Sequence, residues 1–291
     1  MAYWIDHYAR QWRKAGHQVC DHIGLGKLPD ADLVIVHIDL TVVPPEYVDL
    51  IRQLPATLNG EVLDISRRHF NQRLLSSADP YAGPVIVKTD ANYGNVPEAS
   101  LKRRRNRKRR ASGWLTRQVL APLKHPLLRK MNPFPRKRPD TSRPPTQHWN
   151  TVESLDPFAY PVFPDLQSVP AAIWTNPHLI VEPFIRNYEE GLHYVCYYEF
   201  FGDKYISGRI GSPHPIVKFS NSVAAETIPL PAEVKQWREE LKMDFGRLDY
   251  LKSDGKYVLI DINKTEGGST TNDKYHKELK HLASGLDIFL T

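Results

Sequence analysis

MDFGRLDYLKSDGKYVLIDINKTEGG, residues 243–268, reads as two strands joined by a tight turn. Its two halves, residues 245–252 and 256–263, alternate apolar and polar side chains, which is typical of strands with one buried face. Between them lies Ser-Asp-Gly, a composition typical of hairpin turns. We therefore expect an antiparallel hairpin in this part of the chain.

The polar face of this hairpin is acidic. Asp261 and Asn263 share a face of the second strand, because side chains two residues apart point to the same side. A three-residue loop with Gly255 in the left-handed conformation would pair Arg247 with Asp261 and place Asp249 diagonally on the same face. A two-residue loop would turn Asp249 to the other face. The argument for a shared acidic face therefore depends on the three-residue register.

Two carboxylates and an amide on one face repel one another unless a cation lies between them. Hard oxygen donors of this kind suit Mg2+ or Mn2+. The sequence therefore predicts that Asp249, Asp261 and Asn263 are metal ligands. The alternative is a solvent-facing hairpin with ordinary surface charges, since charged edge strands are common.

The composition is that of a soluble globular protein. The chain has 291 residues, 41% hydrophobic and 25% charged, with a net charge of +6, and is long enough for two or three subdomains. Cys20 and Cys196 cannot build a disulfide framework or a zinc site, so we expect a reducing compartment and a cytoplasmic location. No apolar signal segment begins the sequence, and the longest apolar run, residues 33–43, contains His37 and Asp39, so we expect no membrane span.

Strand-like and helix-like segments alternate over about the first 75 residues, which predicts a small α/β domain. Residues 31–40, ADLVIVHIDL, read as a buried parallel strand, and residues 66–76 as a helix. His37 and Asp39 end the strand, where α/β folds bind ligands. A merely hydrogen-bonded pair at the strand end is an equal alternative.

A second aliphatic strand, residues 84–88 (PVIVK), ends in Lys88 and is followed by the loop TDANYGNVPE. An ammonium at a strand end is suited to phosphate oxygens. Asn92 and Gly94 are small residues that let backbone N–H groups approach an anion. The segment lacks the pattern of a P-loop, and a structural lysine is the alternative.

Residues 99–150 differ in composition from the rest of the chain. LKRRRNRKRR, residues 101–110, has eight basic residues in ten, and residues 129–145 are rich in Pro, Arg and Lys. We expect a solvated insertion. The alternative is a surface for an anionic partner, namely nucleic acid, an acidic membrane surface or an acidic substrate.

Several of these segments resemble the ATP-grasp superfamily. GRLDY and YVLIDINKTEGG resemble its metal-binding hairpin, GPVIVKTDANYGNVPE resembles the strand and loop whose lysine contacts the nucleotide phosphates, and HLIVEPFI, residues 178–185, resembles its adenine hinge. They occur in the expected order. The resemblance implies an ATP-grasp fold, α/β with an α+β ATP-binding part, in which a small N-terminal domain precedes two sheets that clasp the nucleotide.

The resemblance also implies domain limits. These are an N-terminal α/β domain over residues 1–78, a central subdomain over 79–180 that carries the basic, Pro-rich insertion at about 99–150, and a C-terminal subdomain with the metal site over 181–291.

The same resemblance assigns roles to individual residues. It implies Mg2+ or Mn2+ on Asp249, Asp261 and Asn263, and catalytic roles for Lys88, Arg209 and Arg247. A basic residue of the preceding helix is Arg67 or Arg68 here, in place of the usual lysine, and the ribose-binding acid is Glu190 or, alternatively, Glu189. The implied ATP contacts are Lys88, Asn92, Gly94, Glu182, the backbone of Phe184, Glu190 and Lys218.

The implied activity is that of an ATP-dependent ligase, which joins a carboxylate to an amine through an acyl phosphate and releases ADP and phosphate. The substrates would be small molecules or peptides that carry these groups. A kinase acting on a small hydroxylated substrate is one alternative. A non-catalytic anion-binding protein that uses the basic insertion is the other.

Deletion of residues 101–145 tests the independence of the insertion from the nucleotide site. We expect the shortened protein to bind ATP as tightly as the full chain, because no implied ATP contact lies in the deleted segment. Calorimetric titration of both proteins with ATP measures this, and a loss of more than about tenfold in affinity, or 1.4 kcal/mol, would place a nucleotide contact in the insertion.

Overall fold

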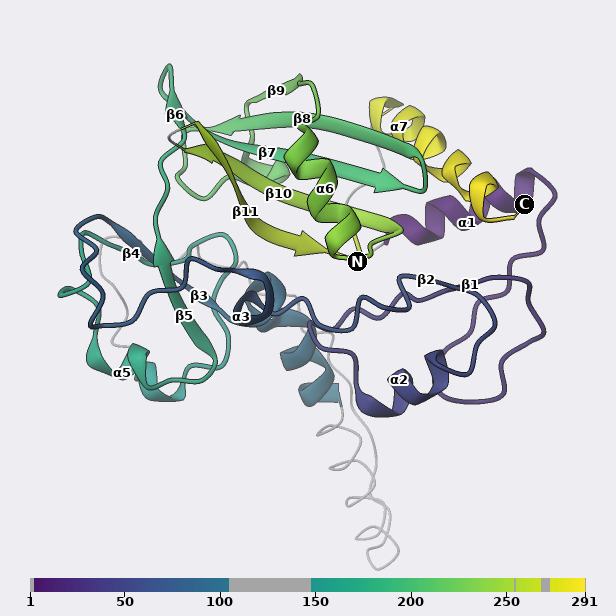
Figure 1. Ribbon diagram of the computed structural model, residues 1–291, viewed down its shortest axis with the longest axis horizontal. Coiled ribbons are helices and arrows are strands. Elements are labelled where there is room, and N and C mark those ends of the chain that lie inside the picture. The colour runs from purple at the N-terminus through teal and green to yellow at the C-terminus, as the bar shows by residue number, and fades with distance from the viewer. Residues whose placement is uncertain (1–2, 105–147, 254, 268–272, 291) are drawn as a thin grey trace, which may run out of the picture.

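A computed structural model describes residues 3–104, 148–253, 255–267 and 273–290 (Figure 1). The expected fold class is confirmed, since helices accompany two antiparallel sheets and a short parallel ladder. Most of the basic insertion lies outside the described residues, which reach it only in a helical stretch over 96–104 and again from residue 148. No helix among the described residues is long and apolar enough to cross a membrane.

The larger sheet has six strands in the order β11-β10-β7-β8-β9, with β6 pairing beside β7. Each pairing in it is antiparallel. Its strands are β6 (Tyr188–Glu189), β7 (Leu192–Phe201), β8 (Lys204–Ser212), β9 (Ala224–Thr227), β10 (Phe245–Ser253) and β11 (Lys256–Asn263).

The two faces of this sheet differ because side chains alternate along each strand. One face is apolar and packs against α6 (Ala232–Glu240) through Tyr198, Phe200 and Leu248. Figure 1 shows α6 lying across that face. The opposite face carries Glu199, Arg247 and Asp249, which are paired neighbours on β7 and β10. The polar face is the one that the functional site uses.

The smaller sheet has the order β4-β3-β5 and is antiparallel throughout its described pairings. Its strands are β4 (Val162–Phe163), β3 (Val85–Thr89) and β5 (Leu179–Pro183), and α5 (Ala171–Trp174) packs beside it. All of β3 is buried, Lys88 included, because apolar side chains from the segment around α5 cover it. The short helices α3 (Arg67–Phe70) and η1 (Asn92–Asn95) connect the two sheets through their side-chain contacts with β11.

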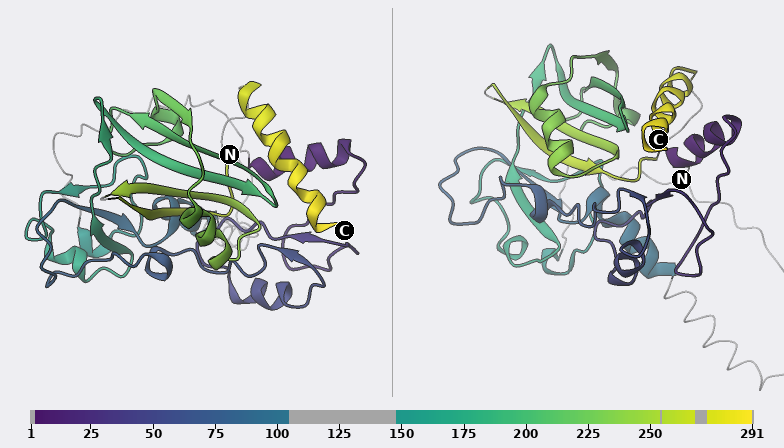
Figure 2. Two further views of the ribbon diagram at one scale, coloured as in Figure 1. Left: turned by 45° about the horizontal axis from the view of Figure 1, so that its top comes forward. Right: turned by 45° about the vertical axis from the view of Figure 1, so that its right-hand side comes forward.

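The N-terminal region supports one end of the large sheet. Helix α1 (Trp4–Lys14) and helix α7 (Asp273–Ala283), followed by η5 (Ser284–Phe289), pack their apolar sides around Phe201 and Phe245. Figure 2 shows α1 and α7 side by side at this end, although they come from opposite ends of the sequence. The remaining elements are β1 (Val34–Ile35), α2 (Pro45–Ile51), β2 (Thr57–Leu58), η3 (Trp149–Thr151) and η4 (Phe219–Asn221).

Two expectations for this region are wrong in extent. The strand expected over residues 31–40 is only β1, whose parallel ladder with β2 ends at the bond from Val36 N–H to the Leu58 carbonyl. The helix expected over residues 66–76 is only α3. It ends early because Asn71 adopts an extended conformation and its side chain donates to Glu182 on β5.

Gly246→Ala tests the close approach of β10 to β11. Gly246 has a φ of +138°, and a Cβ there would overlap with the Asn263 carbonyl oxygen. We expect the substitution to lower the free energy of unfolding by about 3 kcal/mol or more, because backbone strain and a steric clash add. Urea unfolding measures this.

Gly255→Ala is the matched control, since Gly255 also has a positive φ, +77°, but no neighbouring atom would lie within 4 Å of the added Cβ. Its expected cost is about 1–2 kcal/mol, from conformation alone. Equal losses in the two variants would show that the contact with Asn263 does not constrain the hairpin.

Candidate functional site

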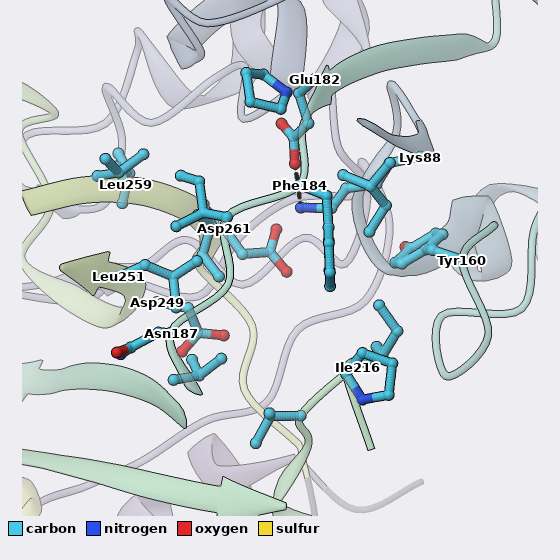
Figure 3. A pocket seen from close by; sticks show the side chains of 18 of the residues that line it. Lys88, Tyr160, Glu182, Phe184, Asn187, Ile216, Asp249, Leu251, Leu259 and Asp261 are labelled. Carbon is cyan, nitrogen blue, oxygen red and sulfur yellow. Dashed lines mark ion pairs between the residues drawn. The ribbon is translucent and has the colours of Figure 1, made fainter. Parts of the chain in front are cut away.

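A cleft lies between the two antiparallel sheets, with about 860 Å³ of space counting the part open to solvent. Apolar side chains from both sheets and from the loop after β8 line it, among them Ile86, Phe184, Ile216, Leu251 and Leu259. The charged residues that line it are Arg67, Arg73, Lys88, Glu182, Lys218, Asp249 and Asp261. Apolar and charged side chains are thus interspersed around the cleft, and Figure 3 shows Phe184 beside Lys88 and Leu251 near Asp249.

The two acids of the hairpin lie directly opposite each other. Asp249 pairs with Asp261, and Arg247 pairs with Asn263, so the expected pairing of Arg247 with Asp261 is wrong. Ser253 pairs with Lys256, which is the register of the two-residue loop. That register alone would separate the acids onto two faces.

A β-bulge returns them to one face. The register shifts between Asp249 and Tyr250, because Tyr250 pairs with Leu259 while Asp249 pairs with Asp261. Ile260 is therefore the extra residue on β11, and one extra residue turns every later side chain to the opposite face. The two carboxylates share a face, as expected, but for a different reason.

Lys88 and Glu182 come from neighbouring strands of the small sheet and form an ion pair along the cleft wall. The Lys88 Nζ lies 2.5 Å from Oε1 of Glu182, and both side chains are buried. The other carboxylate oxygen of Glu182 accepts a hydrogen bond from Asn71. In Figure 3 the side chains of Lys88 and Asp261 point into the cleft from opposite sheets.

Arg67 is the basic residue that the helix α3 brings to the site. Its side chain is only 2% exposed, and its NH2 donates to Oδ1 of Asp261 at 2.8 Å. Its NH1 donates to the carbonyls of Thr89 and Ala91, just beyond Lys88. Arg68 instead pairs with Asp90 on the outside. Of the two arginines that the sequence left open, the structure brings Arg67 to the cleft.

Arg247 lies beside Asp249 on β10. Its Nε donates to Asp249 Oδ1 at 2.5 Å, and its NH1 lies 3.3 Å from Glu199 on β7. The guanidinium also stacks over the ring of Phe219, at 4.4 Å from the centroid. The nearby carboxylates, Asp249 before Glu199, raise the pKa of Arg247 against the opposing effect of burial. Arg247 is therefore a fixed cation next to the acid pair.

Glu199 is a site residue that the sequence reasoning missed. Burial raises the pKa of its carboxyl group to about 7, although Arg247 acts in the opposite direction. A single acid within the aromatic run YYEFF of a buried strand was the signal that could have identified it. Burial raises the pKa of Tyr8, and the carboxylates of Glu266, in the loop after β11, and of Glu199 act in the same direction.

Lys218 reaches the cleft from the loop between β8 and β9. Burial lowers the pKa of its ammonium, while Asp261 and Asp249 act to raise it. The two directions together place Lys218 in a low-dielectric space close to both hairpin acids. Its backbone is held by a bond from Lys218 N–H to Asn221 Oδ1.

The loop of Asn92 and Gly94 lies against the hairpin, outside the lining of the cleft. Asn92 Nδ2 lies 3.2 Å from Asn263 Oδ1 and 3.2 Å from the Ile262 carbonyl. Gly94 has a φ of +66°, and a Cβ there would overlap with the Leu155 carbonyl. Asn92 thus orients the amide of Asn263, and Gly94 permits the close packing that holds the loop.

Besides Asn92 and Gly94, three further residues are not placed as the resemblance implies: Arg209, with an implied catalytic role, and the implied ATP contacts Glu190 and Phe184. Arg209 pairs with Cys196, so it lies on the sheet face opposite to Asp249, where it contacts Glu189 and Glu226. Glu190 is exposed in the turn between β6 and β7. Phe184 does line the cleft, but its N–H already donates to the Pro84 carbonyl at 2.8 Å.

The hairpin donors fit a hard divalent cation that also has phosphate ligands. Within the described residues no group of three or more His, Cys, Asp or Glu side chains could hold a metal alone. Two opposed carboxylates with Asn263 beside them are nonetheless the small donor set that Mg2+ uses when substrate phosphates complete its shell.

Glu199→Gln tests the buried carboxyl. The folded-state pKa of Glu199, about 7, lies above the ordinary value of 4.5, so the folded protein binds more protons between these values. The free energy of unfolding of the wild type should therefore fall, relative to that of the variant, by on the order of 3 kcal/mol as the pH rises from 4.5 to 7. Above pH 7 the difference between the two proteins should stay constant. Urea unfolding at pH 5 and pH 8 measures this, and a difference between the proteins that does not change with pH would contradict it.

The chain is similar to known proteins in structure rather than in sequence. No family model matches it, and no curated protein is similar to it in sequence. A D-alanine–D-alanine ligase from Bacillus anthracis complexed with ATP aligns over 44% of this chain and 49% of that chain, at 19% identity and a TM-score of 0.28. The macrocyclase MdnC from Microcystis aeruginosa MRC, bound with the precursor peptide MdnA, aligns over 39% of this chain and 37% of that chain, at 12% identity and a TM-score of 0.29.

These alignments span about half or less of the length of the solved chains, and likeness at this level defines no activity for this chain. The order of elements along the chain is a more direct observation. The lysine strand β3, the hinge strand β5 and the acidic hairpin β10–β11 follow in the order that the sequence motifs predicted, and they enclose one cleft between two antiparallel sheets.

Proposed function

We propose that this protein is an ATP-dependent ligase that joins a carboxylate to an amine through an acyl phosphate and releases ADP and phosphate. One observation carries the proposal. Asp249 and Asp261 lie directly opposite each other on one sheet, and the basic side chains of Arg67, Lys88 and Lys218 line the same cleft. Opposed acids beside clustered cations suit a divalent ion and a chain of phosphates.

The charged side chains that line the cleft would receive the phosphates. Asp249, Asp261 and Asn263 would hold Mg2+ or Mn2+, which supplies charge neutralisation across the phosphate oxygens when bound. Lys88 and Lys218 carry point charges toward the same space, and the Arg67 fork matches two phosphate oxygens. The guanidinium of Arg247, next to Asp249, would supply the catalytic positive charge that the resemblance implied for Arg209.

The apolar side chains that line the cleft would receive the adenine ring. They include Ile86, Phe184, Ile216, Leu251 and Leu259, and flat apolar surfaces of this kind bury an aromatic base. The backbone contact expected at Phe184 is used by Pro84, so adenine recognition would fall to the neighbouring chain, which continues along the wall through Ile185 and Asn187. Asn187 also replaces Glu190 as a polar side chain that lines the cleft in this segment.

The reaction needs no nucleophile from the protein. A substrate carboxylate would attack the γ-phosphate, and an amine would then displace phosphate from the acyl phosphate. The chain's own residues would hold the reacting groups in line and stabilise the charge that develops on the transferred phosphoryl group. Arg247 and Lys88, fixed by buried ion pairs, are already oriented before substrate arrives.

Asp261→Ala tests the proposal. We expect the variant to fold and to lose Mg2+-dependent release of ADP by at least about 100-fold, because one of two opposed carboxylate ligands is gone. The measurement is an ADP-release screen over pools of carboxylates and amines. Glu226→Gln, an exposed acid on β9, is the control and should keep wild-type turnover.

The products decide between the two ATP-dependent reactions. Release of phosphate together with ADP supports the ligase, whereas a stable phosphorylated product identifies a kinase. Normal turnover by Asp261→Ala would show that the hairpin does not hold the catalytic metal.

A further inference from the structure

The acids proposed as metal ligands are already neutralised by arginines of the same chain. Asp261 is paired with Arg67 at 2.8 Å, and Asp249 is paired with Arg247 at 2.5 Å. The side chains of these four residues are 2–13% exposed. Lys88 is likewise paired, but with Glu182, which is not among the proposed ligands.

Separating such a pair is costly where water cannot compensate. A buried carboxylate or guanidinium that loses its partner remains as an uncompensated charge. Arg67 has little freedom to leave, because its NH1 is bound to the Thr89 and Ala91 carbonyls and its side chain is buried. A cation that arrived alone at Asp261 would therefore face a fixed guanidinium of the same sign.

A nucleotide phosphate removes this conflict. Phosphate oxygens accept two parallel hydrogen bonds from an arginine fork, as a carboxylate does. When a phosphate chain and a divalent cation enter together, Arg67 exchanges Asp261 for phosphate, and Asp261 exchanges Arg67 for the cation. Neither exchange leaves a buried charge without a partner.

We propose that Arg67 is a positioning residue that couples metal binding to nucleotide binding. Before a nucleotide binds, Arg67 neutralises Asp261. It releases the Asp261 carboxylate to the cation only when a phosphate group pairs with the guanidinium instead. This rests on the proposed function, because it assumes that the cleft binds a nucleotide with a divalent ion. Coupling of this kind is reciprocal, and its usual size is roughly 5- to 150-fold in affinity.

The test measures Mn2+ binding to the full chain without any nucleotide, from the loss of the electron paramagnetic resonance signal of free Mn2+. We expect Arg67→Met to bind Mn2+ at least about fivefold more tightly than wild type, the lower end of that range, because Asp261 is then unpaired. Lys88→Met is the matched control. It removes one positive charge from the same cleft but frees Glu182 rather than a proposed ligand.

Two results would overturn the inference. One is an Mn2+ affinity of Arg67→Met equal to that of wild type. The other is an equal gain in Lys88→Met, which would mean that only the total charge of the cleft matters. Thermal melting followed by circular dichroism shows whether each variant folds.

If Arg67→Met does not fold, Arg247→Met replaces it, since it frees Asp249 in the same way, and the same two results decide. These readouts do not involve turnover. An unchanged Mn2+ affinity with intact ATP-dependent ligation removes the coupling and leaves the proposed function, whereas a failure of the nucleotide to bind with or without Mn2+ removes the proposed function itself.

Discussion

The pairing of Asp249 with Asp261 across β10 and β11 is the constraint on which the site depends. Like charges directly opposite each other on neighbouring strands repel, and their burial makes the repulsion stronger. The fold keeps this arrangement because an arginine reaches each acid, Arg247 from the same strand and Arg67 from α3. One of the two acids is thus balanced by a neighbour on its own strand, and the other by an arginine that the tertiary structure brings from a distant element.

Arg67 also joins the two sheets. Its NH1 binds carbonyls at the end of β3 and just beyond it, and its NH2 binds Asp261 on β11. A second connection to β11 is the hydrogen bond from Asn92 Nδ2 to Asn263 Oδ1. Apolar contacts accompany these hydrogen bonds, since Phe70 of α3 packs in the cluster of Ile262, and Ile216 packs against the cluster of the small sheet. The width of the cleft therefore depends on the same groups that would contact a ligand.

Strand alternation and motif order predicted much of this from the sequence. They identified Lys88, Glu182 and the hairpin acids, and the structure brings all of them to one cleft. They did not give the loop register, because the bulge at Ile260 leaves no compositional mark. The resemblance implied a catalytic role for Arg209, whose side chain lies on the sheet face opposite to Asp249, because the side on which a residue points depends on pairing along β7 and β8 that only the folded chain defines. Glu199 lies far from the hairpin in the sequence, and its local sequence did not indicate that it would contact Arg247.

The charge inventory of the cleft restricts what it can bind. A simple anion would draw Arg67 or Lys88 away and leave the Asp261 or Glu182 carboxylate buried without a cationic partner. A lone cation would instead bind the carboxylates and leave Arg67 or Lys88 buried without an anionic partner. A ligand that carries both signs, several phosphates and a divalent ion, satisfies both sets of groups at once. Lys218, which lies close to both hairpin acids in a low-dielectric space, gains an anionic neighbour in the same step. The electrostatics of the empty site therefore favour a metal–polyphosphate complex over either of its components.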